Sequence, residues 1–180
     1  VNADRKATHE DYTIKMILDS EISSLIANAG SLYEFGPVHV AKLVEPKIDG
    51  PKLAETLSEA DDFFFDQGIN YLPLLHQIVS SEIDADRMDY LRRDSFHAGV
   101  SYGNFDFNWL IDHLTYHVAD NSAYLGLENR AVYTFEDFLI SRYHMFMMVY
   151  FHHKGIIYDT MLGEYFACED CNYAIPGDIE

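Results

Sequence analysis

Helical periodicity is the feature of this sequence that most constrains its fold. Hydrophobic residues recur at spacings of three and four along most of the chain, as expected for helices with one buried face. The clearest case runs from Asp84 to Ala98, where Met88 and Leu91 can face the core and Gly99 follows as a stop. The pattern therefore predicts a mainly α fold.

Further helix boundaries are marked by residues that commonly cap, start or end helices. They are a capped start at Thr8 with Asp11, an end at Gly30, starts at Pro37 and Pro51, a helix over 70–81 with Pro73 in its first turn, and a short helix from Asp106 to Leu114. From Arg130 the helical pattern continues to about Phe166, with a bend predicted near Gly155.

One segment is predicted to be extended rather than helical. The runs 115–118 and 123–127 are joined by the turn-forming residues 119–122, which predicts a small β-hairpin. We therefore expect a helical bundle with one hairpin over residues 1–166, followed by an acidic tail, or the start of a further segment, over residues 167–180.

The charge of the chain limits its partners. The formal net charge is −18, from 30 acidic and 12 basic residues, and such a chain repels polyanions, which disfavours general nucleic-acid binding. An anionic substrate would need a local cluster of Arg and Lys, or a bound cation, to reverse the field inside a cleft. The sequence has no uncharged apolar run long enough for a membrane span.

The cysteines and the ends of the chain give weaker indications. Cys168 and Cys171 form a single C-x-x-C pair, and a zinc site needs four ligands, so we expect two reduced thiols and a cytoplasmic location. The chain starts at Val1, and its last stretch shows no evident end to a fold. We therefore expect it to be a piece of a longer protein.

The run 83–94 contains the residues best suited to chemistry. On a helix, Asp86, Tyr90 and Asp94 are spaced four apart and share one face, with Arg87 at its edge. This face offers carboxylates, a cation and an aromatic hydroxyl, which suit a site for a metal, a phosphate and a sugar. On spacing alone, a solvated and salt-bridged face is the simpler interpretation.

The order of these residues resembles a known enzyme signature. The pattern Asp-x-Asp-Arg-x-Asp-Tyr-x-x-Arg-Asp, followed by His97-Ala98-Gly99-Val100, closely resembles the signature of HD-domain deoxynucleotide triphosphohydrolases. Further matches, in the same order as in that family, lie at 8–10, 104–106, Arg142, Tyr150, His152 and 159–161. Together they cover the chain from His9 to Met161, and they imply an HD-domain helical bundle.

The resemblance implies roles for four residues of the 84–98 helix. Asp86 matches the last aspartate of the family's H…HD…D set of metal ligands, and Arg87 takes the place of a basic residue that holds substrate phosphate. Tyr90 matches a tyrosine that packs against the deoxyribose and crowds out a 2′-hydroxyl. Asp94 matches an acid that accepts a hydrogen bond from the sugar 3′-hydroxyl.

Outside that helix the resemblance implies further contacts to the nucleotide. They are His9 near the phosphate, Arg142 on phosphate, Tyr150 and His152 in the nucleotide pocket, and His153, or Lys154 one position later, where a family member has a lysine. Arg142 and His153 differ by eleven residues, about three helical turns, so on a continuous helix they project the same way. His152 then points elsewhere, to another part of the ligand or to a structural role.

The chain departs from the family at the other metal ligands. The resemblance implies a divalent cofactor (Mg, Mn, Fe, Ni or Zn), held by a His and a His-Asp pair that precede the position of His9. This chain has no His-Asp dipeptide and eight residues before His9. Because one carboxylate cannot hold a catalytic ion firmly, we expect the chain on its own to be inactive and its longer parent to be the enzyme.

The implied activity is metal-dependent hydrolysis of deoxynucleoside triphosphates to a deoxynucleoside and triphosphate. A homo-oligomer is implied as well. Two alternatives stay open: an HD phosphohydrolase acting on another nucleotide, and a catalytically incomplete nucleotide-binding or interaction module. In the second, the aromatic and Met-rich run 143–151 would be a partner-binding face, although such a run is more often core.

Overall fold

The computed structural model describes residues 8–46, 57–58 and 60–168, and these form two compact units. The first unit comprises Val1–Asp89 and Phe107–Val132, and the second comprises Tyr90–Asp106 and Tyr133–Glu180. Three predictions concern positions outside the described residues: the helix start at Pro51, the thiol of Cys171 and most of the 167–180 tail.

The mainly α fold is confirmed. In chain order the elements are α1 (His9–Asp19), α2 (Glu21–Gly30), α3 (Pro37–Val44), η1 (Asp62–Phe64), β1 (Phe65–Asp66), β2 (Ile69–Asn70), α5 (Leu72–Val79), α6 (Ala85–Ala98), α7 (Phe107–Asp112), β3 (Leu114–Ala119), β4 (Ser122–Leu127), η2 (Asn129–Ala131), α8 (Val132–Met145), η3 (Phe146–Tyr150) and α9 (His153–Ala167). None of the helices within the described ranges is long and apolar enough to cross a membrane.

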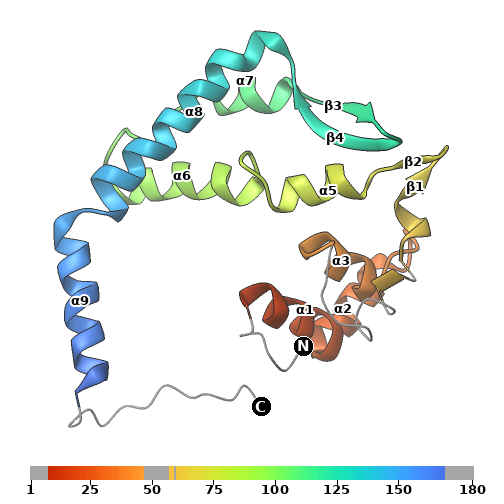
Figure 1. The fold of residues 1–180 in the computed structure, drawn as a ribbon, viewed down its shortest axis with the longest axis horizontal. Coiled ribbons are helices and arrows are strands. Elements are labelled where there is room, and N and C mark those ends of the chain that lie inside the picture. The colour runs from red at the N-terminus through yellow and green to blue at the C-terminus, as the bar shows by residue number, and fades with distance from the viewer. Residues whose placement is uncertain (1–7, 47–56, 59, 169–180) are drawn as a thin grey trace. The chain divides into compact units, whose positions relative to one another are not determined.

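The first three helices pack together in the first unit (Figure 1). As predicted, Asp11 Oδ2 accepts a hydrogen bond from the Thr8 backbone N–H at 2.8 Å, α2 ends at Gly30 and α3 begins at Pro37. Their core is built around Ile14, Ile17, Ala41 and Leu57, which are all buried.

One cation is buried beside this core. The Lys42 ammonium donates to the Leu57 carbonyl oxygen at 3.1 Å and pairs with the Asp61 carboxylate. Burial lowers the pKa of Lys42, but the partners satisfy the charge. The ion pair therefore joins the end of α3 to the segment that precedes the sheet.

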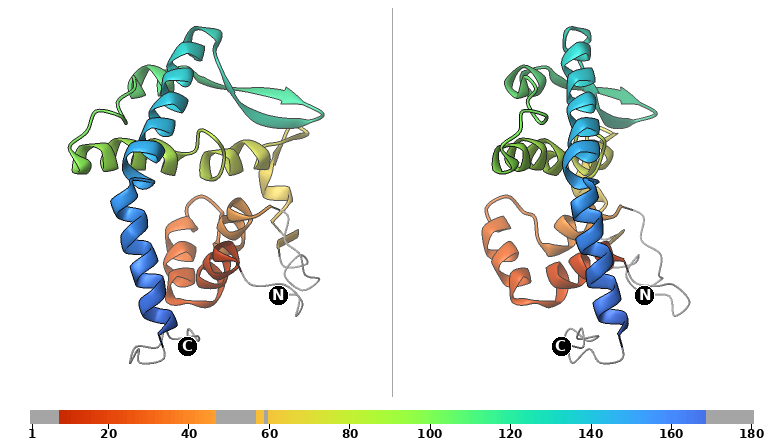
Figure 2. Two further views of the ribbon diagram at one scale, coloured as in Figure 1. Left: turned by 60° about the vertical axis from the view of Figure 1, so that its left-hand side comes forward. Right: turned by 90° about the vertical axis from the view of Figure 1, so that its left-hand side faces the viewer.

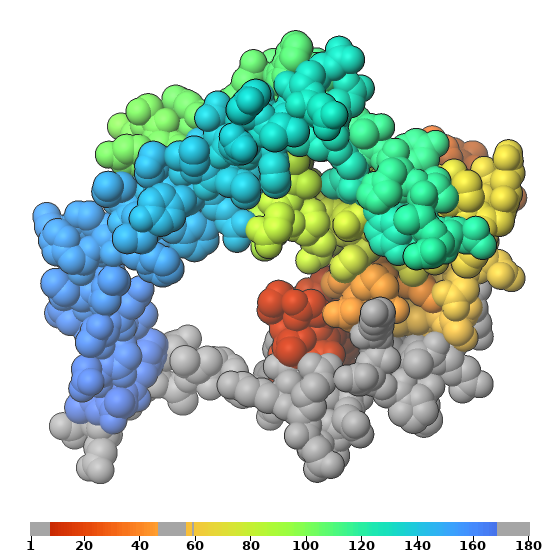
Figure 3. Space-filling model, turned by 45° about the horizontal axis from the view of Figure 1, so that its top comes forward, coloured from red at the N-terminus to blue at the C-terminus, as the bar shows by residue number. Residues whose placement is uncertain are grey.

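The predicted hairpin is present as β3 and β4, within a small sheet of strand order β1-β2-β4-β3. Its turn residues Asp120 and Asn121 both have positive φ, 49° and 56°, which matches the twist of a two-residue hairpin turn. Gln77 of α5 accepts a hydrogen bond from the Leu125 backbone N–H at 2.8 Å, so the hairpin is tied to α5. Figure 3 shows the side chains of this hairpin (green to teal) beside those of β1 and β2 (yellow). The two-residue strands β1 and β2 were not predicted.

The second unit buries side chains of both α6 and α8. Leu91, Phe138 and Met145 are fully buried there. α6 ends at Ala98, and Gly99 follows with φ 68°, as the stop signal predicted. The Ser95 hydroxyl donates to the Val100 carbonyl at 2.7 Å and accepts from the Gly103 N–H at 3.1 Å, which holds the following loop against α6.

The helical pattern predicted from Arg130 to Phe166 is interrupted, and the interruption comes before the bend that was predicted near Gly155. α8 ends at Met145, a π-helical turn (η3) follows, and the chain leaves helical geometry at His152, where ψ is 132°. The bend therefore lies at Phe151 and His152, and Gly155 is inside α9. Figure 2 shows α9 continuing from the end of α8 beyond this break. Every residue from Phe151 to Cys168 is exposed.

Gly103 gives a direct test of the packing in the second unit. A Cβ at this position would overlap the Leu91 carbonyl oxygen and press on Ser95 Cβ, so the backbone must move. We expect Gly103→Ala to lower the free energy of unfolding by about 1–3 kcal/mol, measured by urea titration.

The matched control is Gly163→Ala in α9. A Cβ at Gly163 would meet no atom within 4 Å, and alanine favours helix more than glycine, so this variant should not lose stability. Equal unfolding midpoints for Gly103→Ala and the unaltered protein would contradict the close packing of the loop on α6.

Candidate functional site

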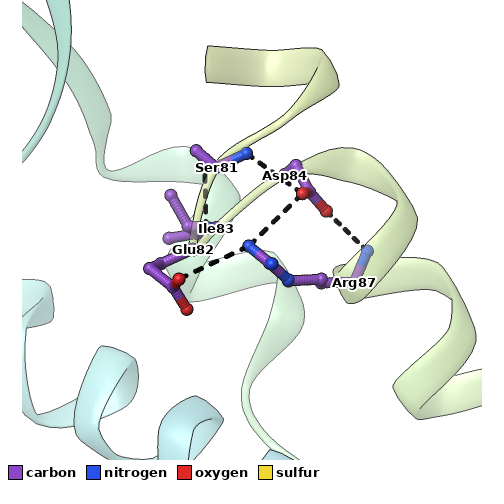
Figure 4. A network of polar contacts seen from close by, with 5 residues as sticks. All are labelled: Ser81, Glu82, Ile83, Asp84 and Arg87. Atoms are coloured by element: carbon purple, nitrogen blue, oxygen red, sulfur yellow. Dashed lines mark hydrogen bonds and ion pairs between the residues drawn. The ribbon is translucent and has the colours of Figure 1, made fainter. Parts of the chain in front are cut away.

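The start of α6 is fixed by one buried carboxylate. Asp84, which is 6% exposed, precedes the first helical residue; its Oδ1 accepts from the Arg87 N–H at 2.8 Å and its Oδ2 from the Ser81 N–H at 3.1 Å. The Ser81 hydroxyl accepts from the Ile83 N–H at 3.2 Å (Figure 4). Because both oxygens of Asp84 are engaged, the position at which the helix begins is firmly defined.

The same carboxylate also pairs with the Arg87 side chain. Arg87 Nη1 lies 3.5 Å from Asp84 Oδ2 and 3.8 Å from Glu82 Oε1 (Figure 4). The Asp84 side chain is 9% exposed, whereas that of Glu82 is 68% exposed. Arg87 is therefore held by one buried and one solvated carboxylate.

Asp86, the predicted metal ligand, has an exposed side chain. Among the residues that the structure describes, no three His, Cys, Asp or Glu side chains gather closely enough to hold a metal ion. The residues present therefore do not fit a divalent cation on their own, and the role of Asp86 stays a prediction.

In the second unit the structure brings together three of the predicted site residues. The Tyr150 hydroxyl donates to Asp94 Oδ2 at 2.7 Å, although the two residues are 56 positions apart. The Tyr90 ring lies edge-on to the Tyr150 ring, with centroids 6.2 Å apart, and Arg93 Nε is 3.4 Å from Asp94 Oδ1. Burial and the Asp94 hydrogen bond raise the pKa of Tyr150 well above its ordinary value, so the hydroxyl stays a proton donor.

Arg142 lies on α8, in the same unit. Its guanidinium carbon is 5.9 Å from the centroid of the Phe146 ring, which is a cation–π contact. The Arg142 side chain is half-buried.

The prediction that Arg142 and His153 project the same way assumed a continuous helix, and the structure contradicts that premise. The π-helical turn and the break at His152 change the rotation between them. His152 immediately precedes α9: its Nδ1 accepts from the Lys154 N–H at 3.4 Å, and the centroid of its ring lies 4.2 Å from that of His153. All three side chains at 152–154 are exposed.

His9 belongs to the first unit and begins α1. Its side chain is 90% exposed, and Nε2 lies 2.9 Å from Glu10 Oε1. This contact at the surface leaves the imidazole accessible to solvent.

Two residues near these groups were missed from the sequence. Asp84 caps α6 and holds Arg87, and Arg93 approaches Asp94. An acidic residue three positions before an arginine at a helix start could have identified the Asp84 cap. The Arg93 contact has no comparable local pattern.

Comparisons with known proteins bear on these residues. The family described as HD associated region matches residues 105–170. The uncharacterized protein MJ1154 of Methanocaldococcus jannaschii is 35% identical over 94 residues, 52% of this chain and 21% of its own length. The uncharacterized protein YwfO of Bacillus subtilis is 28% identical over 145 residues, 80% of this chain and 27% of its own length.

A relative with a stated activity covers more of the chain. The deoxynucleoside triphosphate triphosphohydrolase SAMHD1 of Bos taurus is 24% identical over 175 residues, 96% of this chain and 29% of its own length. The chain thus spans between 17% and 31% of the length of these curated relatives. The family match and the triphosphohydrolase relatives support the resemblance to HD-domain phosphohydrolases that the motifs indicated.

Proposed function

We propose that this chain supplies nucleotide-binding residues of an HD-domain phosphohydrolase that converts deoxynucleoside triphosphates to a deoxynucleoside and triphosphate. The observation that carries the proposal is the hydrogen bond between Tyr150 and Asp94, with the Tyr90 ring beside it. Three residues matched separately to sugar and nucleotide contacts are thereby neighbours in the folded chain. The triphosphohydrolase relatives support the same substrate class.

In this proposal Asp94 and Tyr90 recognise the deoxyribose. Tyr150 and Arg93 approach different oxygens of the Asp94 carboxylate, and a carboxylate offers about four lone-pair sites. Asp94 therefore keeps the capacity to accept a hydrogen bond from a sugar 3′-hydroxyl. The rigid Tyr90 ring would occupy the space that a 2′-hydroxyl needs, which would select against ribonucleotides.

Arg87, Arg142 and Lys154 would bind the phosphates. In a chain with a net charge of −18, each of these cations would offset part of the charge of a triphosphate. Their contacts to phosphate oxygens would stabilise the charge that builds during transfer to water, and His9 would give or take a proton. The relationship to HD-domain enzymes implies metal dependence, but the described residues do not fit the ion, so no step is assigned to it.

A nucleotide-binding module without turnover is the second candidate. It is favoured by the finding that, in the described ranges, no metal-ligating side chains gather around Asp86 or elsewhere. Binding of a deoxynucleoside triphosphate without triphosphate release would support this candidate. Hydrolysis of a different nucleotide, a homo-oligomer and a cytoplasmic location stay predictions.

The activity is tested by a triphosphate-release assay on the full-length protein. We expect release from a deoxynucleoside triphosphate, and we expect Asp86→Ala to reduce its rate by more than about a hundredfold, since it removes the carboxylate matched to a metal ligand. Asp112→Ala, which alters an exposed aspartate of α7, is the control and should retain the rate. An unchanged rate in Asp86→Ala would show that the assignment is mistaken.

The Tyr150–Asp94 bond is tested by the pH dependence of stability. Because the folded state raises the pKa of Tyr150, its contribution to stability is complete below about pH 10 and is lost as the pH rises further. We therefore expect the stability difference between the unaltered protein and Tyr150→Phe to be constant from pH 7 to about 9.5 and to shrink above that.

Urea unfolding at each pH measures this difference. Tyr133→Phe is the control, because Tyr133 is an exposed tyrosine of the same unit, and its difference should not follow this course. A Tyr150→Phe difference that stays constant or grows up to pH 11 would argue against the bond.

A further inference from the structure

We propose that Asp84 is a positioning residue for phosphate recognition, acting through Arg87. The inference rests on the proposed function, in which Arg87 binds substrate phosphate. It assigns to a buried carboxylate, which touches no substrate, the task of presenting one edge of the guanidinium to the phosphate.

The Asp84 carboxylate contacts both the backbone and the guanidinium of Arg87. Asp84 Oδ1 accepts from the Arg87 backbone N–H at 2.8 Å, while Asp84 Oδ2 lies 3.5 Å from Arg87 Nη1 (Figure 4). Asp84 is itself fixed by the Ser81 N–H and by burial. A flexible side chain held at its backbone and at its tip loses less freedom when a ligand binds, which is the basis of preorganisation.

The contacts also define which edge of the guanidinium is left for a ligand. Asp84 and Glu82 both approach Nη1. In the part of the chain that the structure describes, Arg87 Nε and Nη2 make no hydrogen bond or ion pair. Nε and Nη2 lie on one edge of the group and form the fork that binds two phosphate oxygens in parallel.

Asp84 and Glu82 are predicted to act in opposite ways. Both carboxylates carry a negative charge near Nη1, and either charge repels a phosphate, so neutralising it should by itself favour phosphate binding. Asp84 is buried and also holds the backbone of Arg87, whereas Glu82 is mostly exposed and lies further from Nη1. Loss of positioning should therefore outweigh loss of repulsion at Asp84 but not at Glu82.

The experiment compares the affinity of the full-length protein for deoxyadenosine triphosphate and for deoxyadenosine by calorimetry. Asp84→Asn keeps a residue that caps helices well but removes the charge that pairs with Arg87. We expect it to weaken triphosphate binding by roughly three- to tenfold and to leave deoxyadenosine binding unchanged. Glu82→Gln should leave triphosphate binding unchanged or make it tighter.

A double variant distinguishes an effect that acts through Arg87 from general damage to the fold. If Asp84 acts through Arg87, then Asp84→Asn should not weaken triphosphate binding further in the Arg87→Ala background. An equal loss of deoxyadenosine and triphosphate affinity in Asp84→Asn, or a further loss in the Arg87→Ala background, would overturn the positioning role.

The two proposals fail in different ways. If Arg87→Ala weakens triphosphate binding but Asp84→Asn does not, the positioning role is refuted and the role of Arg87 stands. If Arg87→Ala leaves triphosphate binding unchanged, the phosphate contact in the proposed function is refuted, and the positioning role falls with it.

Discussion

The capping of α6 by Asp84 is the interaction on which the start of this helix and the position of Arg87 depend. Asp86 and Arg87 follow Asp84 closely, in the first turn of the helix, so the cap defines the backbone that carries them. Asp84 sets the start of the helix through two backbone hydrogen bonds and holds Arg87 as well. Asp84 thus fixes the backbone at the start of the helix and also the position of the Arg87 guanidinium.

The second constraint is the irregular turn after α8. The π-helical segment ends at Tyr150, whose hydroxyl reaches Asp94 of α6 and whose ring meets Tyr90. π-Helical turns cost stability relative to α-helix and frequently occur at functional sites. In the second unit, this turn ends at Tyr150 and so places it beside Asp94 and Tyr90.

Features that depend on neighbouring residues could be predicted from the sequence, and features that depend on distant ones could not. The Thr8 cap, the Gly99 stop and the hairpin turn at Asp120 follow from local backbone preferences, and all three are confirmed. The break at His152 was not predicted, because the spacing of hydrophobic residues does not distinguish a π-helical turn from an α-helix. The site residues came from a resemblance in order and spacing, whereas the contact between Asp94 and Tyr150 spans 56 positions and needed the fold.

The central claim is that Tyr90, Asp94 and Tyr150 form a binding surface for a deoxyribose. The most direct measurement is a calorimetric comparison of deoxyadenosine triphosphate with adenosine triphosphate on the full-length protein. The claim predicts that the deoxynucleotide binds at least roughly tenfold more tightly, and that Tyr90→Ala removes most of this difference by making room for the 2′-hydroxyl. Equal affinity for the two nucleotides in the unaltered protein would contradict it.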